Sequence, residues 1–420
     1  MPIMLTQGIR RWPQKNTPLK RQAVLAVMGQ GAGLYCISIQ VEGIFLCQPI
    51  ILKGAFMAIT KVEVCLSEDD AVQVIRSMDR MQGVKEHRLN FQYPEHWFAP
   101  VTLSPFAQQI EQETISWMQG IGLIKDKKTL SLVRAMEPGF FAGFSYSMAP
   151  YDHALLFCKC VTMWLLWDDE RVEIAKTYEE IEAPVKALYG DKIPTHQMND
   201  PYVQGFKHLG DEHERLGASK HWRKRFAASM AEWGSHAIYE EVLRRNNESD
   251  DRRSLEEAIQ LRALTTGFTP TTIPVEQIAG LELPDELLES EDYKSILDCA
   301  AKICLIVNDV VGVPKDICND QIKSNVILYY MNANNVSLFD AYNLAIKIHD
   351  DAVNTYDKLV ANLLKSFPPE NRAGINNFFN LIRYLETGFG IWQEKCIRYQ
   401  QSVAAQMNQS YRIAITRRLA

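Results

Sequence analysis

The chain has 420 residues, of which 47% are apolar and 10% aromatic, so it contains ample material for a large buried core. Its net charge of −6 and pI near 5.9 give no electrostatic reason to expect a nucleic acid as partner. An anionic ligand would therefore need a local cation site. No apolar run reaches the roughly 18 residues that a membrane span requires.

The nine cysteines are odd in number and lack paired spacing, which predicts reduced thiols in a cytoplasmic protein. Neither an HExxH nor a CxxC motif occurs, so the sequence does not support a zinc site. We expect Cys158 and Cys160, which lie on an apolar stretch, to be small buried side chains.

The first 87 residues differ from the rest and are predicted to form an N-terminal extension, to which we assign no function. They contain short β-branched runs between glycines, among them Leu34–Val41. The segment Gly29–Gly33 follows an apolar run and suggests a dinucleotide loop. A dinucleotide-binding turn should open a helix, however, whereas Leu34–Val41 alternates like a strand. A two-domain redox protein stays open as an alternative.

Residues 88–420 are predicted to form one all-α domain, because apolar residues recur there at three- and four-residue spacing. A segment rich in proline and aromatic residues, FQYPEHWFAP, leads into it. Helices are predicted over residues 104–121, 127–137, 150–170, 172–189, 199–210, 218–245, 253–266, 290–311, 320–332, 336–364 and 371–410.

A group of acids, DDERVE, begins at Asp168 directly after the apolar run LLFCKCVTMWLLW. Paired carboxylates at the end of a buried helix are costly unless a cation compensates their charge. Hard oxygen ligands suit Mg²⁺, which binds carboxylates together with phosphate oxygens and water. The placement of the acids, more than the pair itself, indicates a metal and diphosphate site. The pair alone could equally be a solvated helix end.

A second polar motif, NDVVGVPKD, follows another apolar helix pattern. Asn308, Gly312 and Asp316 are spaced four residues apart, so they share one face if the helix persists past Pro314, where a bend is expected. Oxygens of Asn308 and Asp316 can hold one Mg²⁺. Lys315 stands beside them and can reach a phosphate oxygen.

The two motifs together resemble the aspartate-rich and NSE-type metal motifs of microbial class I terpene synthases. Asp168, Asp169 and Glu173 match the first motif. The second motif of the family reads N/D-D-x-x-S/T-x-x-K-E, which Asn308 and Asp309 match with the residues that follow them. The resemblance spans roughly residues 89–410 and implies an all-α bundle of the isoprenoid synthase type.

The resemblance also assigns residues outside the two motifs. It implies that Arg262 is the diphosphate sensor before a helix break, with Thr265 and Thr266 at the positions that follow. Near the C-terminus it implies an Arg-Tyr pair after a Trp, which Trp392, Arg398 and Tyr399 supply. The pair Arg383-Tyr384 is a weaker candidate, because no Trp precedes it at this spacing.

Two residues depart from the family pattern, and both belong to the second motif. Gly312 replaces a serine or threonine and has no side-chain oxygen, so a water would have to take that position. Asp316 replaces a glutamate and is one methylene shorter. Both departures put the affinity of the same metal in question.

The resemblance implies that three Mg²⁺ ions hold the diphosphate of a linear isoprenyl substrate between the motifs. Ionisation is then electrostatic, with Arg262, Lys315, Arg398 and Tyr399 donating to phosphate oxygens. The resulting cation needs an apolar pocket with aromatic faces. The expected pocket residues are Phe157, Trp164, Phe268, Phe389 and Trp392.

The sequence leaves the substrate, the oligomeric state and two alternative functions open. The substrate could be farnesyl or geranylgeranyl diphosphate, with a slight preference for the longer chain because of the extension and the divergent motif. His153 and His236 are expected to be ordinary core or surface histidines rather than bases. The resemblance also makes a homodimer an expectation. The alternatives are a catalytically weakened homologue and a chain-elongating prenyltransferase, although the latter needs a second aspartate-rich motif.

Overall fold

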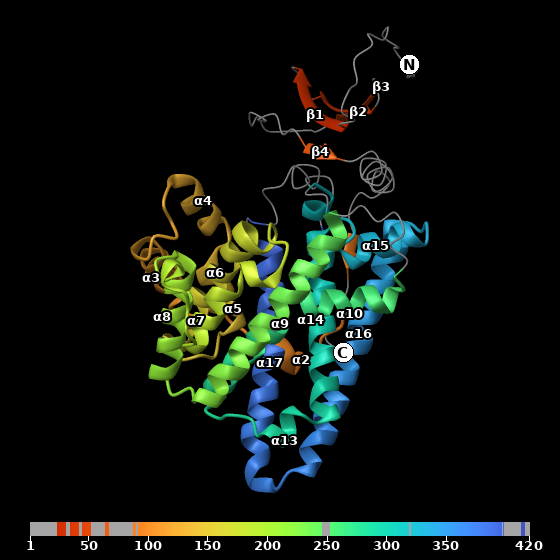
Figure 1. Cartoon of the computed structure of the whole chain (residues 1–420). Coiled ribbons are helices and arrows are strands. Elements are labelled where there is room, and N and C mark those ends of the chain that lie inside the picture. Colours follow the sequence, from red (N-terminus) through yellow and green to blue (C-terminus); the bar gives the residue numbers. More distant parts are fainter. Residues whose placement is uncertain are drawn as a thin grey trace. The chain divides into compact units, whose positions relative to one another are not determined.

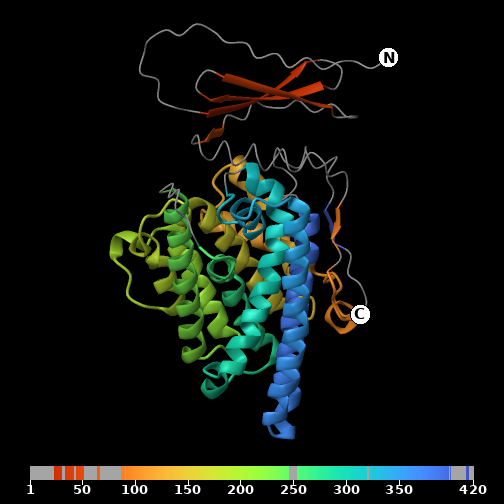
Figure 2. The ribbon, with the colours of Figure 1, turned by 90° about the vertical axis from the view of Figure 1, so that its right-hand side faces the viewer.

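The computed structural model divides into two compact units, Met1–Glu86 and His87–Ala420 (Figures 1 and 2). The described residues are 23–30, 34–41, 44–51, 64–66, 87–89, 91–245, 253–318, 321–396, 398 and 413–415.

The N-terminal unit contains a four-stranded antiparallel sheet in the order β3-β2-β1-β4. Its strands are β1 (Ala23–Gln30), β2 (Leu34–Val41), β3 (Ile44–Ile51) and β4 (Val64–Leu66). The predicted strand Leu34–Val41 is therefore confirmed. Strand β2 pairs antiparallel with β1 from Leu34 opposite Gln30 onward. A strand, not a helix, thus follows the glycines, which contradicts the dinucleotide-turn hypothesis.

The second unit is helical, as predicted, apart from the short parallel pair β5 (His87–Leu89) and β6 (Ile413–Ile415). Its α-helices are α2 (Glu95–Phe98), α3 (Ala107–Gly120), α4 (Lys127–Ala135), α5 (Pro138–Ser145), α6 (Tyr151–Trp167), α7 (Glu182–Tyr189), α8 (Pro201–Arg215), α9 (Lys220–Arg245), α10 (Leu255–Thr265), α11 (Phe268–Thr272), α12 (Pro274–Ala279), α13 (Asp285–Leu288), α14 (Glu291–Cys318), α15 (Val326–Ala333), α16 (Leu338–Ser366) and α17 (Pro369–Lys395).

Helix α14 carries the second motif, and α6 leads directly into the first. Both helices are rich in apolar residues and are surrounded by other helices. Helix α14 packs along α16 and against α17 and α10, and Figure 2 shows α14 and α16 side by side. Helix α6 packs against α3, α5 and α8. Its Cys158 and Cys160 are buried free thiols, as expected. Among the described helices, none has both the length and the hydropathy that crossing a membrane demands.

Several predicted helices are wrong in extent, and α2, α5, α11, α12 and α13 were not predicted. Helix α14 continues to Cys318 instead of ending at 311, and α15 begins at Val326 instead of at 320. Residues 172–189 do not form one helix, because Thr177 is extended and α7 begins only at Glu182. Helix α17 ends at Lys395 rather than continuing to 410, since Cys396 has an extended backbone. Helix α5 was missed because its sequence, PGFFAGFS, is rich in glycine and aromatic residues rather than helix formers.

The proline- and aromatic-rich segment that contains α2 packs onto α16 and α17. Trp97 is fully buried, and its indole nitrogen donates to the carboxylate of Asp357 at 3.1 and 3.2 Å. The guanidinium of Arg383 pairs with the same carboxylate at 2.8 Å and lies over the rings of Trp97 and Tyr356. This cluster fixes the start of the helical unit against α16 and α17.

We expect Trp97→Ala to lower the free energy of unfolding by about 3–5 kcal/mol, because it removes a fully buried ring and leaves a cavity. Denaturant titration followed by circular dichroism measures the change. Met198→Ala is the control, since Met198 is 43% exposed and its loss should cost below about 0.5 kcal/mol. Equal effects of the two substitutions would contradict the assigned packing.

Candidate active site

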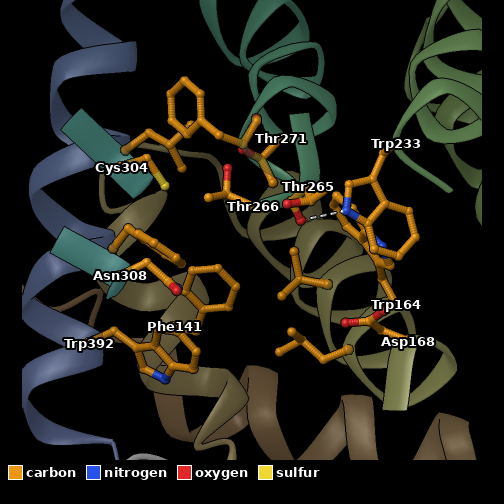
Figure 3. Close-up of a pocket in the computed structure, with 16 residues that line it drawn as sticks. Phe141, Trp164, Asp168, Trp233, Thr265, Thr266, Thr271, Cys304, Asn308 and Trp392 are labelled. Atoms are coloured by element: carbon orange, nitrogen blue, oxygen red, sulfur yellow. Dashed lines mark hydrogen bonds between the residues drawn. The ribbon is translucent and has the colours of Figure 1, made fainter. Parts of the chain in front are cut away.

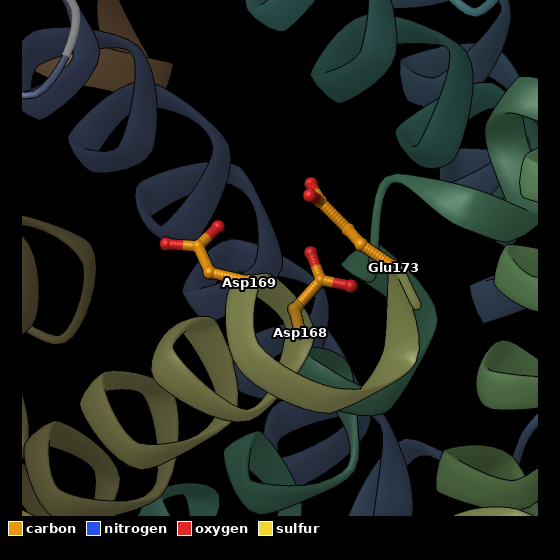
Figure 4. A group of neighbouring side chains, drawn as sticks. All are labelled: Asp168, Asp169 and Glu173. Atoms are coloured by element: carbon orange, nitrogen blue, oxygen red, sulfur yellow. The ribbon is translucent and has the colours of Figure 1, made fainter. Parts of the chain in front are cut away.

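A π-helical turn, Asp168–Val172, continues directly from the end of α6 and carries the first motif. Its wider winding is shown by the amide of Glu173, which donates to the carbonyl of Asp168, five residues earlier, at 3.0 Å. Residues five apart therefore share a face. The carboxylates of Asp168, Asp169 and Glu173 offer oxygens within 4.8 Å of one another (Figure 4).

The three carboxylates carry more negative charge than the surrounding protein compensates. Burial raises the pKa of Asp168 well above its usual value, and repulsion from Glu173 and Asp169 raises it further. Burial also raises the pKa of Glu173, with repulsion from Asp169 and from Glu241 on α9 adding to the shift. Close, partly buried carboxylates that repel one another form a donor set that a hard divalent cation fits.

Arg398 lies against this cluster from the C-terminal segment. Its guanidinium donates two hydrogen bonds to the carboxylate of Asp169, at 2.7 and 2.8 Å. The chain reaches this position because α17 stops at Cys396, whose thiol donates to backbone carbonyls of Ala135 and Met136. Tyr399, its predicted partner, lies outside the described residues.

Arg383 of the weaker Arg-Tyr candidate instead binds Asp357 in the cluster around Trp97. The geometry therefore favours Arg398 as the arginine near the first motif. His236 shares a hydrogen bond with the carbonyl of Glu232 on its own helix. Neither His236 nor His153 is among the residues that line the main cavity.

The second motif lies on α14, which remains helical past Pro314 to Cys318. Arg262, the predicted sensor, bridges α10 and α14. It donates to Asn308 Oδ1 and to Asp309 Oδ1, both at 2.9 Å, and to Thr265 Oγ1 at 3.3 Å. Burial raises the pKa of Asp309 to about 6, although the guanidinium of Arg262 opposes the shift. The sensor arginine is thus fixed to the first two residues of the second motif.

Asn325, which the sequence analysis missed, joins the second motif to α15. Its side-chain amide donates to the carbonyl of Asp309 at 2.7 Å and to Asp316 Oδ2 at 2.8 Å. Its side-chain oxygen accepts from the amides of Ile327 and Leu328 and so caps α15. One buried residue therefore positions both the carboxylate of Asp316 and the start of the next helix.

The two departures of the second motif are linked in space. A Cβ atom added to Gly312 would lie 2.7 Å from Asp316 Oδ2. The short side chain of Asp316 thus folds over the glycine and reaches Asn325. Burial raises the pKa of Asp316, while Lys315 and Asn325 oppose the shift. A larger residue at 312 and the present position of Asp316 are mutually exclusive.

The break between α10 and α11 falls at Gly267, whose φ of +77° favours glycine. A Cβ atom there would lie 2.9 Å from the indole of Trp164. Trp233 on α9 packs edge-on against Trp164 and donates its indole N–H to the carbonyl of Thr265 at 3.0 Å. Two tryptophans thus hold the break in place beside Arg262.

The two motifs and this break surround an aromatic cavity with an empty volume of about 660 Å³, part of which is its open mouth. Figure 3 shows Asp168 and Asn308 on opposite sides of it, with Thr265 and Thr266 at the break. The lining residues are Phe141, Val161, Trp164, Leu165, Asp168, Trp233, Thr265, Thr266, Gly267, Phe268, Thr271, Cys304, Asn308, Leu385, Phe389 and Trp392.

Four of the five expected pocket residues are in this lining, and Phe157 is not. Phe157 is buried one turn farther along α6, against Phe141 and Tyr146. The lining also contains Trp233 and Cys304, which sequence reasoning did not select. Trp233 belongs to a long helix, α9, whose apolar residues carry no distinctive motif.

Comparison with known proteins agrees with this geometry. Residues 159–355 match the model of "Terpene synthase family 2, C-terminal metal binding". The chain is 21% identical over 315 residues to pristinol synthase of Streptomyces pristinaespiralis, covering 72% of this chain and 83% of that protein. It is 25% identical over 233 residues to (−)-β-caryophyllene synthase ((2E,6E)-farnesyl diphosphate cyclizing) of Saccharothrix espanaensis, covering 54% and 65%.

Among solved structures, wild-type cucumene synthase superimposes with a TM-score of 0.58 at 16% identity, covering 70% of this chain and 97% of that chain. This likeness shows a shared fold. The chain belongs to the microbial class I terpene synthases. It is therefore an enzyme of the lyase type that acts on prenyl diphosphates.

We expect Asp168→Asn to stabilise the metal-free synthase at neutral pH. The folded-state pKa values of Asp168 and Glu173 are raised. The folded state therefore holds their protons more tightly than the unfolded chain, and the associated stability is lost as pH rises through the folded values. Removing one charge relieves the repulsion. For each kcal/mol of repulsion that the substitution removes, the melting temperature in EDTA should rise by roughly 2–4 °C. This rise should be smaller near pH 4 than at neutral pH.

Glu170→Gln is the control for this measurement, because Glu170 belongs to the same acidic sequence but lies outside the cluster, where Tyr202 donates to it. It should give no increase in melting temperature. A lower melting temperature for Asp168→Asn than for the wild-type synthase at neutral pH would contradict the repulsion between these carboxylates.

Proposed function

We propose that the synthase ionises and cyclises a linear isoprenyl diphosphate, farnesyl or geranylgeranyl, in a Mg²⁺-dependent reaction that releases diphosphate. The observation that carries the proposal is the pairing of an acidic cluster with an aromatic cavity at whose opposite sides Asp168 and Asn308 lie. A polar rim binds the leaving group, while an apolar interior holds the reacting chain.

The residues present fit a magnesium site. Asp168, Asp169 and Glu173 offer converging oxygens, and a divalent cation would relieve their mutual repulsion. Asn308 and Asp316 supply oxygens on α14, where the missing side chain of Gly312 leaves one position to water. By resemblance we expect three ions. Bound Mg²⁺ neutralises charge on the departing diphosphate.

The chain's own groups bind and orient the diphosphate. Arg262 is held by Asp309 and Thr265 and can donate to a phosphate oxygen from a fixed position. Lys315 of the second motif is near enough to Glu173 of the first motif to oppose the rise in the pKa of Glu173. Its charge is therefore close to both motifs. Arg398 is paired with Asp169 and can exchange this partner for a phosphate. Donors fixed in advance stabilise developing charge at little reorganisation cost.

The aromatic lining supports the second half of the proposal, because ring faces attract cations and an apolar cavity excludes water. Trp164, Trp233, Phe389 and Trp392 present such rings from three different helices. A chain-elongating prenyltransferase is disfavoured, since its second aspartate-rich motif is replaced here by Asn308 and the residues after it. The homodimer that the resemblance implies stays a prediction.

Purified synthase with farnesyl or geranylgeranyl diphosphate and Mg²⁺ should yield a cyclic terpene, detected by gas chromatography–mass spectrometry. EDTA, Asp168→Ala and Asn308→Ala should each reduce the rate by about 10²-fold or more, because each removes charge stabilisation from the departing diphosphate. Glu170→Gln should retain the wild-type rate. Turnover that persists in EDTA, or the absence of product from both substrates, would contradict the proposed function.

The coupling between Gly312 and Asp316 gives a further prediction. Gly312→Ser alone should lower the free energy of unfolding by a net amount of about 0.5 kcal/mol. Displacing Asp316 from Asn325 forfeits a hydrogen bond that contributes about 1 kcal/mol, whereas replacing a helical glycine returns about 0.5 kcal/mol.

The control is the double variant Gly312→Ser/Asp316→Glu, which has the family's residues at both positions. Its longer acid can extend past the serine, so we expect it to bind Mg²⁺ and inorganic diphosphate more tightly than Gly312→Ser, measured by titration calorimetry. Equal stability and binding of the single and double variants would show that the two positions are independent.

A further inference from the structure

Helix α6 points one stripe of side chains toward the cavity. Phe157, Val161, Trp164 and Asp168 are spaced by three or four residues and so share a face. The last three line the cavity, whereas Phe157 does not. Val161 lies about 10 Å along the helix from Asp168, at 1.5 Å per residue. The cavity therefore ends within about two helical turns of the diphosphate site.

An aromatic pair fills the space behind the cavity lining at this depth. Phe157 and Tyr146 stack with ring centroids 3.5 Å apart, and each is 3% exposed. On one side, Phe157 packs edge-on against Phe141, a lining residue of α5. On the other side, the hydroxyl of Tyr146 donates to the carbonyl of Thr271, a lining residue of α11. The pair therefore supports lining residues of both α5 and α11 from behind, and we call it the aromatic floor.

We propose that the aromatic floor selects farnesyl over geranylgeranyl diphosphate, with Phe157 as the residue that determines chain length. This inference rests on the proposed function, because the acidic cluster and Arg262 must fix the diphosphate at the mouth. The chain then has only the space between the mouth and the floor. This proposal replaces the slight preference for geranylgeranyl diphosphate that was drawn from the sequence.

The cavity volume supports this choice. If each carbon occupies about the 30 Å³ that a water molecule takes in the liquid, the fifteen carbons of farnesyl need about 450 Å³ and the twenty of geranylgeranyl about 600 Å³. The empty volume is about 660 Å³ including the open mouth, where the diphosphate must also lie. The farnesyl chain leaves about 210 Å³ of this space for the head group, whereas the geranylgeranyl chain leaves only about 60 Å³.

The test measures binding, so that it does not depend on turnover. Titration calorimetry with Mg²⁺ compares the unreactive thiolodiphosphate analogues of the farnesyl and geranylgeranyl substrates. We expect wild-type synthase to bind the farnesyl analogue at least about tenfold more tightly, a ratio typical of apolar size discrimination. Phe157→Ala should shift the ratio toward the longer analogue by about tenfold or more, and Phe157→Leu should shift it in the same direction but less.

Phe206→Leu is the matched control. Phe206 is a fully buried ring on α8 that packs against Trp167 and is not in the cavity lining. Its loss should lower the melting temperature and leave the binding ratio unchanged. Equal affinity of the wild-type synthase for both analogues, or a ratio unchanged in folded Phe157→Leu, would overturn the aromatic floor. Binding with the expected ratios but no cyclic product would instead overturn the proposed function alone.

Discussion

The concentration of negative charge beside an apolar cavity is the constraint on which the rest of this structure depends. Burial raises the pKa of both Asp168 and Glu173, and repulsion from Glu173 and Asp169 raises the pKa of Asp168 further. Arg398 balances Asp169, and Arg262 balances Asp309 on the facing helix. A divalent cation bound at the acidic cluster, as we propose, would offset the remaining repulsion and would in turn bind an anionic leaving group.

Three interruptions of regular helix place these charges. The π-turn after α6 brings Glu173 back over Asp168, the left-handed Gly267 turns the chain beside Arg262, and the extended Cys396 directs Arg398 toward Asp169. Each interruption is held by packing or hydrogen bonds from elsewhere in the chain. For Gly267, these come from Trp164 and Trp233, which also line the cavity. The residues that shape the cavity therefore also fix the groups that we propose bind the diphosphate.

The sequence predicted the helical fold because apolar periodicity is a local property. Residue spacing also identified the two motifs, whose binding of metal stays a prediction. It did not predict the role of Asn325, since a single asparagine beyond a motif has no signal until α15 returns to α14. It also misjudged Phe157, which lies on the expected face of α6 but is covered by Tyr146 from α5's end. The linkage of Gly312 with Asp316 likewise appears only in three dimensions, although both departures were visible in the sequence.

Titration calorimetry with inorganic diphosphate tests whether the acidic cluster and Arg262 form one binding site. It measures binding at the charged groups separately from the reaction of the isoprenyl chain in the cavity. We expect wild-type protein to bind diphosphate only with Mg²⁺, and Asp168→Asn and Arg262→Met each to weaken this binding by at least about tenfold, equivalent to about 1.4 kcal/mol. Equal binding in EDTA, or unchanged affinity in both variants, would mean that the acidic cluster and the sensor arginine do not form one site.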